Sequence, residues 1–246
     1  MEIDTIYNMD CLEGMKMIPD GSVDCIICDL PYGTTACAWD SIIPFDKLWE
    51  QYHRVSKPNA PIVLFGSEPF STMIRMSNLA EFRYDWIWEK SQGADFVHAK
   101  LRPLKKHEVI SVFIKERKDA CYNPQGLTPC HKVKDNSKKF GNSTRDWNHA
   151  DSYVQEWENY PTSILQFGKE GDTFHPTQKP VNLLRYLIAT YSNEGDTILD
   201  NCMGSGTTAI AAIREKRHFI GFELNAEYYE KAMKRIKLER QQLTLF

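Results

Sequence analysis

The fold of this chain is indicated most clearly by one stretch, Val23-Asp24-Cys25-Ile26-Ile27-Cys28-Asp29-Leu30-Pro31-Tyr32. Its apolar residues show no alternation, which is typical of a strand buried on both faces of a parallel sheet. Pro31 lacks a backbone N–H and disfavours helix at Leu30, so we expect the strand to stop here and leave the Leu30 carbonyl free to accept. Ligands of parallel sheets lie beyond the strand C-terminal ends, which makes Asp29 a candidate functional residue. From this stretch alone, an ordinary turn after a strand is an equal alternative.

Composition favours one catalytic domain with an insertion over two full domains. The chain has 246 residues, of which 42% are hydrophobic, enough for one sizeable core. No apolar run approaches the roughly 18 residues of a membrane span. The start, Met1-Glu2-Ile3-Asp4, lacks the basic and apolar segments of a signal peptide, and we expect a cytoplasmic protein.

The seven cysteines are an odd number without framework spacing, which favours reduced thiols over disulfides. Cys25 and Cys28 lie three apart on a strand and face opposite ways, so they cannot readily chelate one metal. Zinc-ligand spacing is also absent among Cys121, Cys130, His131 and His149. The sequence therefore predicts no metal site.

Charge is segregated along the chain. Residues 97–150 contain twelve basic and five acidic residues, an excess of seven positive charges, while the whole chain carries −3. Such a local excess suits a polyanion better than a neutral small molecule, and it favours a nucleic-acid partner. The alternative is a solvated loop without a partner.

Strands and helices alternate through most of the chain, which predicts an α/β fold with a mostly parallel sheet. Expected strands lie at 6–10, 23–30, 62–66, 84–88, 109–114, 196–200 and 219–222, and expected helices at 11–18, 46–55, 70–76, 183–191, from 207 and 226–240. The alternation is lost over 115–171, where basic residues are mixed with aromatic ones. Basic side chains can bind phosphates, and aromatic rings can stack on bases. The aromatic residues could equally form a small core of their own.

A glycine loop lies between an expected strand and helix, in Asp200-Asn201-Cys202-Met203-Gly204-Ser205-Gly206-Thr207-Thr208-Ala209. Glycines let a ligand approach the backbone, and the helix N-terminus favours a negative group. The next strand ends in Glu223, 19 residues beyond Gly204, where an acid can bind both hydroxyls of a ribose. The same pattern matches the dinucleotide fingerprint, which by itself is a weak signal.

The position of the loop in the chain is more informative. A nucleotide-binding sheet continues with further strands after the second one, yet only one helix follows Glu223. The expected strands at 6–10 and 23–30 can supply the third and fourth. We therefore expect a complete but circularly permuted sheet, with the catalytic half first and the cofactor half last.

The order of motifs resembles the β group of DNA amino-methyltransferases, which use S-adenosylmethionine. The matching motifs are D-L-P-Y, a basic variable region, H-P-T-Q-K-P, D-N-C-M-G-S-G-T-T-A and F-E, and the likeness covers about 1–115 and 171–246. The resemblance implies a seven-stranded, mostly parallel, Rossmann-like methyltransferase sheet. It also implies a catalytic half at 1–115, a target-recognition insertion at 116–170 and a cofactor-binding half at 171–246.

What the resemblance implies for individual residues is as follows. The catalytic set is Asp29, Leu30, Pro31 and Tyr32: Asp29 and the Leu30 carbonyl hold the target amine, and Tyr32 stacks on the flipped base. Glu223 binds the cofactor ribose, Asp10 faces its adenine, and Thr177 and Lys179 face its carboxylate. The remaining cofactor contacts are Asp29, Asp200, Cys202, Gly204, Ser205, Gly206 and Thr207. Leu30 departs from the usual proline, and since a backbone carbonyl is what is needed there, we expect the change to be tolerated.

The basic region matches no readable motif, so the recognition sequence stays open. Its candidate DNA contacts are Lys132, Lys134, Lys138, Lys139 and Arg145. Because cytosine-specific relatives mostly carry serine in place of Asp29, we expect methylation of adenine N6 in double-stranded DNA, with cytosine N4 as the alternative. A homodimer and a cognate restriction endonuclease are possible partners.

Two functions from other classes compete with this prediction. A nicotinamide-dependent dehydrogenase would use the glycine loop and Glu223 but leave Asp29 to Tyr32 idle. A DNA-binding protein with a vestigial cofactor fold would leave the complete set of candidate cofactor and amine contacts unused.

Overall fold

The structure is a computed structural model that describes residues 1–33, 41–135, 152–168 and 178–243. The chain forms two compact units, one made of Met1–Asn123 with Ser163–Phe246 and the other of Pro124–Thr162. The larger unit contains one sheet with strands β1 (Thr5–Tyr7), β2 (Cys25–Cys28), β3 (Ile62–Gly66), β4 (Phe82–Ala94), β5 (Lys105–Phe113), β8 (Ile164–Gln166), β9 (Thr197–Asp200) and β10 (His218–Phe222).

The strand order of this sheet is β1-β10-β9-β2-β3-β5-β4-β8. All neighbouring strands are parallel except β5, which runs antiparallel to both β3 and β4. The two N-terminal strands flank the β9–β10 pair, so the permuted arrangement expected from the glycine loop is confirmed. Seven strands were predicted for this sheet, and the described residues form eight in it. The additional strand, β8, has three residues at the edge beside β4, too few to show a hydrophobic pattern in the sequence.

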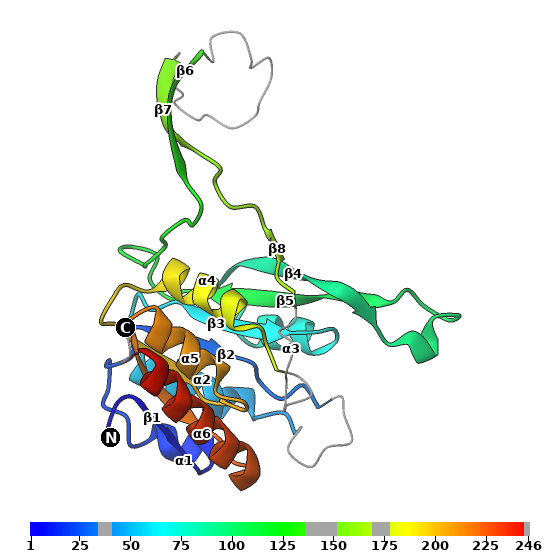
Figure 1. The fold of residues 1–246 in the computed structure, drawn as a ribbon, viewed down its shortest axis with the longest axis vertical. Helices are drawn as coiled ribbons and strands as arrows, with labels where there is room; N and C mark the ends of the chain where they lie inside the picture. Colours follow the sequence, from blue (N-terminus) through cyan, green and yellow to red (C-terminus); the bar gives the residue numbers. More distant parts are fainter. Residues whose placement is uncertain (34–40, 136–151, 169–177, 244–246) are drawn as a thin grey trace. The chain divides into compact units, whose positions relative to one another are not determined.

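Helices cover both faces of the sheet and complete an α/β/α arrangement (Figure 1). One face packs against α1 (Cys11–Met15), α2 (Phe45–Val55) and α3 (Phe70–Ser77). The other packs against α4 (Val181–Tyr191), α5 (Thr207–Arg214) and α6 (Ala226–Leu243). In the part of the chain that the structure describes, no helix is long and apolar enough to cross a membrane.

Strand β2 is buried on both faces, as its unbroken apolar run predicted. Cys25 and Ile27 pack in the core under α4 and α5, whereas Ile26 and Cys28 pack in the core under α1 and α2. Cys25 and Cys28 therefore point to opposite sides of the sheet. Each face buries apolar surface worth about 25 cal/mol per Å², and this fixes the register of the central strand.

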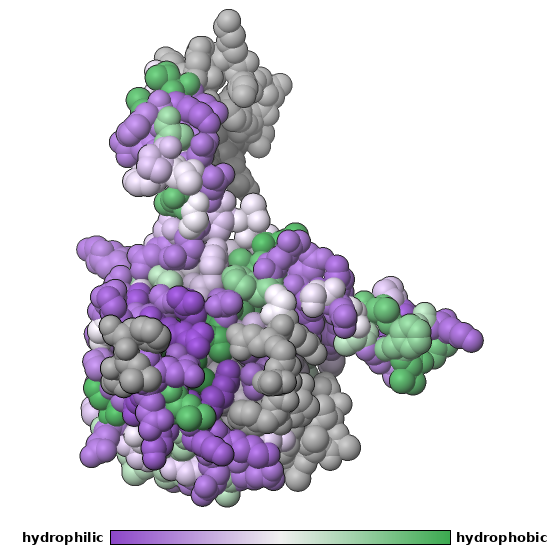
Figure 2. All heavy atoms as spheres, viewed as in Figure 1, coloured by the Kyte–Doolittle hydropathy of each residue, from purple (hydrophilic) through white to green (hydrophobic). Residues whose placement is uncertain are grey.

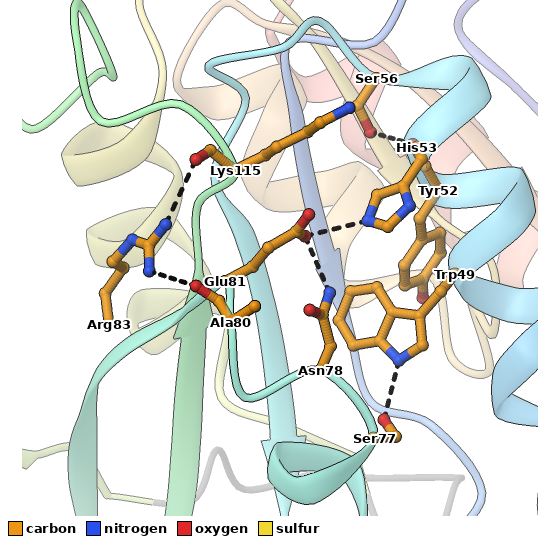
Figure 3. A network of polar contacts seen from close by, with 10 residues as sticks. All are labelled: Trp49, Tyr52, His53, Ser56, Ser77, Asn78, Ala80, Glu81, Arg83 and Lys115. Atoms are coloured by element: carbon orange, nitrogen blue, oxygen red, sulfur yellow. Dashed lines mark hydrogen bonds and ion pairs between the residues drawn. The ribbon is translucent and has the colours of Figure 1, made fainter.

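A polar network joins α2 to the last residue of α3 and to the segment between α3 and β4, at the end of the sheet where β4 begins (Figure 3). Trp49 Nε1 donates to Ser77 Oγ at 2.8 Å, and His53 Nε2 lies 2.9 Å from Glu81 Oε2. Asn78 Nδ2 also donates to Glu81 Oε2, at 2.8 Å. These contacts tie α2 to the segment that leads into β4, at the end of the sheet opposite the carboxyl end of β2.

Strands β4 and β5 are longer than the expected strands at 84–88 and 109–114. β3 pairs only with residues 109–113 of β5, so the two strands run on together beyond their neighbour. We call residues 89–108 the β4–β5 finger; it includes the short 3-10 helix η1 (Phe96–His98). Its polar arms and glycine lack the apolar pattern by which strands are recognised in sequence.

The smaller unit contains an antiparallel ribbon of β6 (Thr128–Asp135) and β7 (Ser152–Glu158). This unit lies within the segment where the strand and helix alternation was expected to stop. Val133 and Val154 are directly opposite each other in the ribbon, and both are exposed. Within its described residues, the ribbon thus does not bury this pair in a core of its own.

Candidate active site

A cavity of about 440 Å³ opens in the larger unit at the carboxyl ends of the parallel strands. It is lined by the residues after β1, β2, β9 and β10, and by side chains of β4 and β5. The candidate site residues that line it are Asp10, Asp29, Leu30, Pro31, Tyr32, Lys179, Asp200, Cys202, Gly204, Ser205, Thr207 and Glu223. Most residues of the predicted catalytic and cofactor sets, which are distant in sequence, therefore face one cavity.

Asp29 follows β2 directly and accepts on both carboxylate oxygens. Tyr32 donates its hydroxyl to Oδ1 at 2.6 Å, and Lys179 Nζ donates to Oδ2 at 2.5 Å. The Tyr32 ring stacks on Phe70, with 5.0 Å between ring centroids and 26° between planes. Burial and the Asp29 carboxylate raise the pKa of Tyr32, so its hydroxyl stays protonated and donates. The turn after β2 is thereby held in one conformation.

Lys179 lies between two carboxylates. Besides Asp29, its ammonium is 3.2 Å from Glu108 Oε2, and Glu108 Oε1 is 2.5 Å from Lys90 Nζ. Burial alone would lower the pKa of Lys179, but Asp29 and Glu108 outweigh it and raise that pKa. Burial likewise opposes ionisation of Glu108, whose pKa is held below its usual value by Lys179 and Lys90. Lys179 and Glu108 are therefore both charged at neutral pH, and acidic and basic side chains alternate from Asp29 through Lys179 and Glu108 to Lys90.

Glu108 and Lys90 were not among the predicted site residues. Glu108 is the single acid immediately before the apolar residues 109–114, and an acid in front of a buried strand is a weak signal. Lys90 lies on the polar extension of β4 that the sequence did not reveal as strand. Both belong to the site because the β4–β5 finger brings them to the cavity wall.

Glu223, at the end of β10, braces the glycine loop. Its Oε2 accepts from the Gly204 N–H at 2.8 Å and its Oε1 from the Asn225 N–H at 2.8 Å. Burial raises the pKa of Glu223, and these two backbone donors oppose that rise. A carboxylate offers about four lone-pair sites, so two remain for ligand hydroxyls.

Within the loop, Gly204 lines the cavity but Gly206 does not. Gly206 has φ of +76° at the start of α5, and a Cβ there would come within 3.2 Å of the Ala232 Cβ. Its role in this structure is to let α5 begin against α6. The side chains of Ser205 and Thr207 turn towards each other, with 2.9 Å between their hydroxyl oxygens.

Asp200, at the end of β9, is fully enclosed. It accepts from Thr208 Oγ1 at 2.6 Å and from the Cys202 N–H at 3.0 Å. Burial raises the pKa of Asp200 to about 6, despite these two donors. The neighbouring Asn201 accepts from the Tyr52 hydroxyl at 2.6 Å, which links the loop to α2.

Asp10 has a structural role as well as a place on the cavity wall. Its Oδ1 caps α1 by accepting from the Leu12 and Glu13 N–H groups at 2.9 and 3.1 Å. The other carboxylate oxygen is not needed for this cap. Thr177, expected to face the cofactor carboxylate together with Lys179, lies outside the described residues.

The cavity fits a ligand that carries positive charge and hydroxyl groups. Its lining contains five carboxylates and two lysines, an excess of negative charge. Oε1 of Gln178 is a buried acceptor without a hydrogen-bond donor in the part of the chain described. Buried acceptors of this kind cost about 1–3 kcal/mol until a donor reaches them. S-adenosylmethionine supplies a sulfonium, an ammonium and two ribose hydroxyls, which match these acceptors.

Of the predicted DNA contacts, Lys132 and Lys134 lie on β6 of the smaller unit. Both are exposed, and Lys132 Nζ lies 2.5 Å from Glu158 Oε2 on β7. Being two residues apart on a strand, they share one face of the ribbon. Lys138, Lys139 and Arg145 lie outside the described residues.

Comparisons with known proteins identify the family of this chain. A family model described as DNA methylase matches residues 23–234. DNA adenine methyltransferase YhdJ of Escherichia coli is 30% identical over 96% of this chain and 83% of its own. Type II methyltransferase M.HpaI of Haemophilus parainfluenzae is 30% identical over 94% of this chain and 73% of its own. The crystal structure of the M1.HpyAVI–SAM complex has a similar fold, with a TM-score of 0.65, 24% identity and coverage of 94% and 98% of the two chains. The chain belongs to the DNA methylase family, whose methyl donor is S-adenosylmethionine.

Proposed function

We propose that this protein transfers a methyl group from S-adenosylmethionine to N6 of adenine in DNA, with Asp29 as the residue that holds the target amine. The observation that carries the proposal is that Asp29 and the Gly204 loop braced by Glu223 line one cavity. The curated relative named as an adenine methyltransferase supports adenine as the base.

The protein contributes to this reaction mainly by positioning the target amine and stabilising the charge that develops on it. An exocyclic amine is a poor nucleophile because its lone pair is delocalised into the ring. Donation of its two N–H groups to Asp29 and to the Leu30 carbonyl favours a tetrahedral nitrogen with a directed lone pair. When bound, S-adenosylmethionine supplies the electrophilic methyl group. Asp29 then stabilises the positive charge that develops on nitrogen, the type of electrostatic effect that commonly dominates catalysis.

The target base must leave the duplex to reach the cavity, at a cost of a few kcal/mol. Tyr32 is proposed to stack on the base and offset part of this cost. Its ring is already fixed by Phe70 and by the hydrogen bond to Asp29. Little further ordering of this side chain is then needed when the base arrives.

The remaining roles are part of the same proposal. Residues 1–115 supply the catalytic half, 171–246 bind the cofactor, and 116–170 recognise the target sequence through the basic residues of the insertion. We also propose a cytoplasmic enzyme that acts on double-stranded DNA, with a homodimer and a partner restriction endonuclease as further possible associations. Sedimentation velocity of the purified protein tests the dimer directly.

Asp29→Ala tests the function. We expect the variant to lose about 3 kcal/mol or more of transition-state stabilisation, because no carboxylate then stabilises the positive charge that develops on the target nitrogen. Cofactor binding should persist because Glu223 and the loop are intact. Nucleoside mass spectrometry of DNA treated with the wild-type protein should detect N6-methyladenine. Methylcytosine alone, or near-normal methylation by the variant, would contradict the proposal.

A further inference from the structure

The tip of the β4–β5 finger exposes large apolar side chains. Phe96 is 80% exposed, Val97 91% and Leu101 83%. Figure 2 shows hydrophobic residues gathered at the end of this projection, and Figure 1 shows the two strands reaching it together. Three such side chains in six residues form a cluster, and exposed apolar clusters mark interaction sites.

The tip is internally ordered around Asp95. This residue has φ of +71°, and its Oδ1 lies 2.5 Å from His98 Nδ1. Its Oδ2 accepts from Arg102 at 2.6 and 3.0 Å. Because these contacts close the loop on its polar side, the apolar side chains are held outward in a defined arrangement.

The charge of the tip and its position identify the partner. Residues 95–106 contain four basic side chains and one acid, which suits a polyanion and disfavours a second copy of the same basic tip. Lys90 and Ala94, on the rising arm of the finger, line the cavity that receives the target base. A duplex whose base enters the cavity therefore passes beside the tip.

We propose that the tip of the β4–β5 finger is a wedge that enters the DNA base stack beside the flipped adenine, an inference that rests on the proposed function. Apolar side chains inserted between base steps replace part of the stacking that is lost, and flanking basic residues hold the phosphates. Phe96, Val97 and Leu101 are the wedge, and Lys100 and Lys105 flank it.

The test compares two DNA substrates. The recognition sequence is first read from DNA methylated in the expression host, and two duplexes carry it: one fully paired, and one with the target adenine opposite an abasic position. The variant Phe96→Ser/Val97→Ser/Leu101→Ser should methylate the paired duplex roughly tenfold or more slowly than the wild type, because it lacks the wedge that offsets unstacking. On the duplex with the unpaired adenine it should stay within about threefold, because that base costs least to flip.

The matched control is Met76→Ser/Leu79→Ser, at side chains that are 66% and 60% exposed outside the finger, and it should leave both rates unchanged. Equal loss on both duplexes, or no loss on the paired one, overturns the wedge. Equal loss together with conversion of a dimer to a monomer in sedimentation velocity assigns the tip to a contact between copies, which also overturns it. Absence of methyl transfer by the wild-type protein on either duplex refutes the proposed function, and this inference with it.

Discussion

Asp29 divides its two oxygens between the Tyr32 hydroxyl and the Lys179 ammonium, and in the proposed reaction the target amine would share Asp29 with both. Lys179 has a second carboxylate partner, Glu108, at 3.2 Å, besides Asp29 at 2.5 Å. Two acids that share one lysine each bind it less tightly than one acid alone would. We therefore expect Glu108 to be a positioning residue that keeps Asp29 available to the target amine.

Glu108→Gln tests this role. Lys179 then has one charged partner, holds Asp29 more firmly and competes with the amine, so we expect kcat to fall by roughly tenfold, about 1.4 kcal/mol, with KM for DNA nearly unchanged. Glu89→Gln is the control, because Glu89 is on the same hairpin but pairs with Lys106 and does not line the cavity. Steady-state kinetics distinguishes the two, and a parallel loss in both variants would argue against positioning.

Glu223→Ala should weaken S-adenosylmethionine binding far more than DNA binding. The change removes a charged acceptor for two hydroxyls, worth roughly 1.5–3 kcal/mol, and also frees the Gly204 N–H. Titration calorimetry measures the cofactor affinity, with Glu227→Ala on the exposed start of α6 as the control. An unchanged affinity would refute the assignment of Glu223.

Among the elements, β6 carries Lys132 and Lys134, two of the residues predicted to contact DNA. Replacing Lys132, Lys134, Lys138 and Lys139 by glutamine should weaken DNA binding and lower its salt slope by roughly 0.9 for each lost phosphate contact. The slope is obtained from affinities measured at several salt concentrations. If it does not change, these lysines do not face DNA.

Elements with a local pattern could be predicted from the sequence. Three such features are the apolar run of β2, the glycine loop before α5 and the acid after β10. Each is a pattern of residues that are neighbours in the chain, and each lies in the structure where the sequence predicted it. The antiparallel direction of β5 and the length of the β4–β5 finger were not predicted, because polar extensions without a buried face carry no periodicity. The contact of Lys179 with Asp29 joins residues 150 positions apart and follows only from the folded sheet.

At the scale of the whole molecule, Asp200 makes stability depend on pH. Its folded pKa of about 6 lies above the ordinary 3.8, so the folded state binds more protons between these values. The contribution of Asp200 to the free energy of unfolding is therefore largest below about pH 4, and it is lost as the pH rises through 6. At pH 8 the buried charge then costs about 3 kcal/mol.

Asp200→Asn should therefore unfold at higher urea concentration than the wild type at pH 8, by up to that amount of free energy, and show little difference at pH 4. An amide oxygen can still accept from the Cys202 N–H, and the Thr208 hydroxyl can rotate to accept from the amide nitrogen. Urea titrations at the two pH values test this. An equal difference at both would show that the charge is not the cause.

The strand order also determines how long each strand waits for its neighbours during synthesis. Ile26 of β2 pairs with Leu199 of β9, 173 positions later in the chain. At about 5–20 residues per second, synthesis of that interval takes roughly 9–35 s. Once β3 has been synthesised, the nascent β2 can pair with it on one edge, but its other edge keeps unpaired N–H and C=O groups until β9 follows, and such edges recruit other chains. We expect soluble yield to depend on chaperones and on expression temperature, and polypeptides truncated before Thr197 to aggregate.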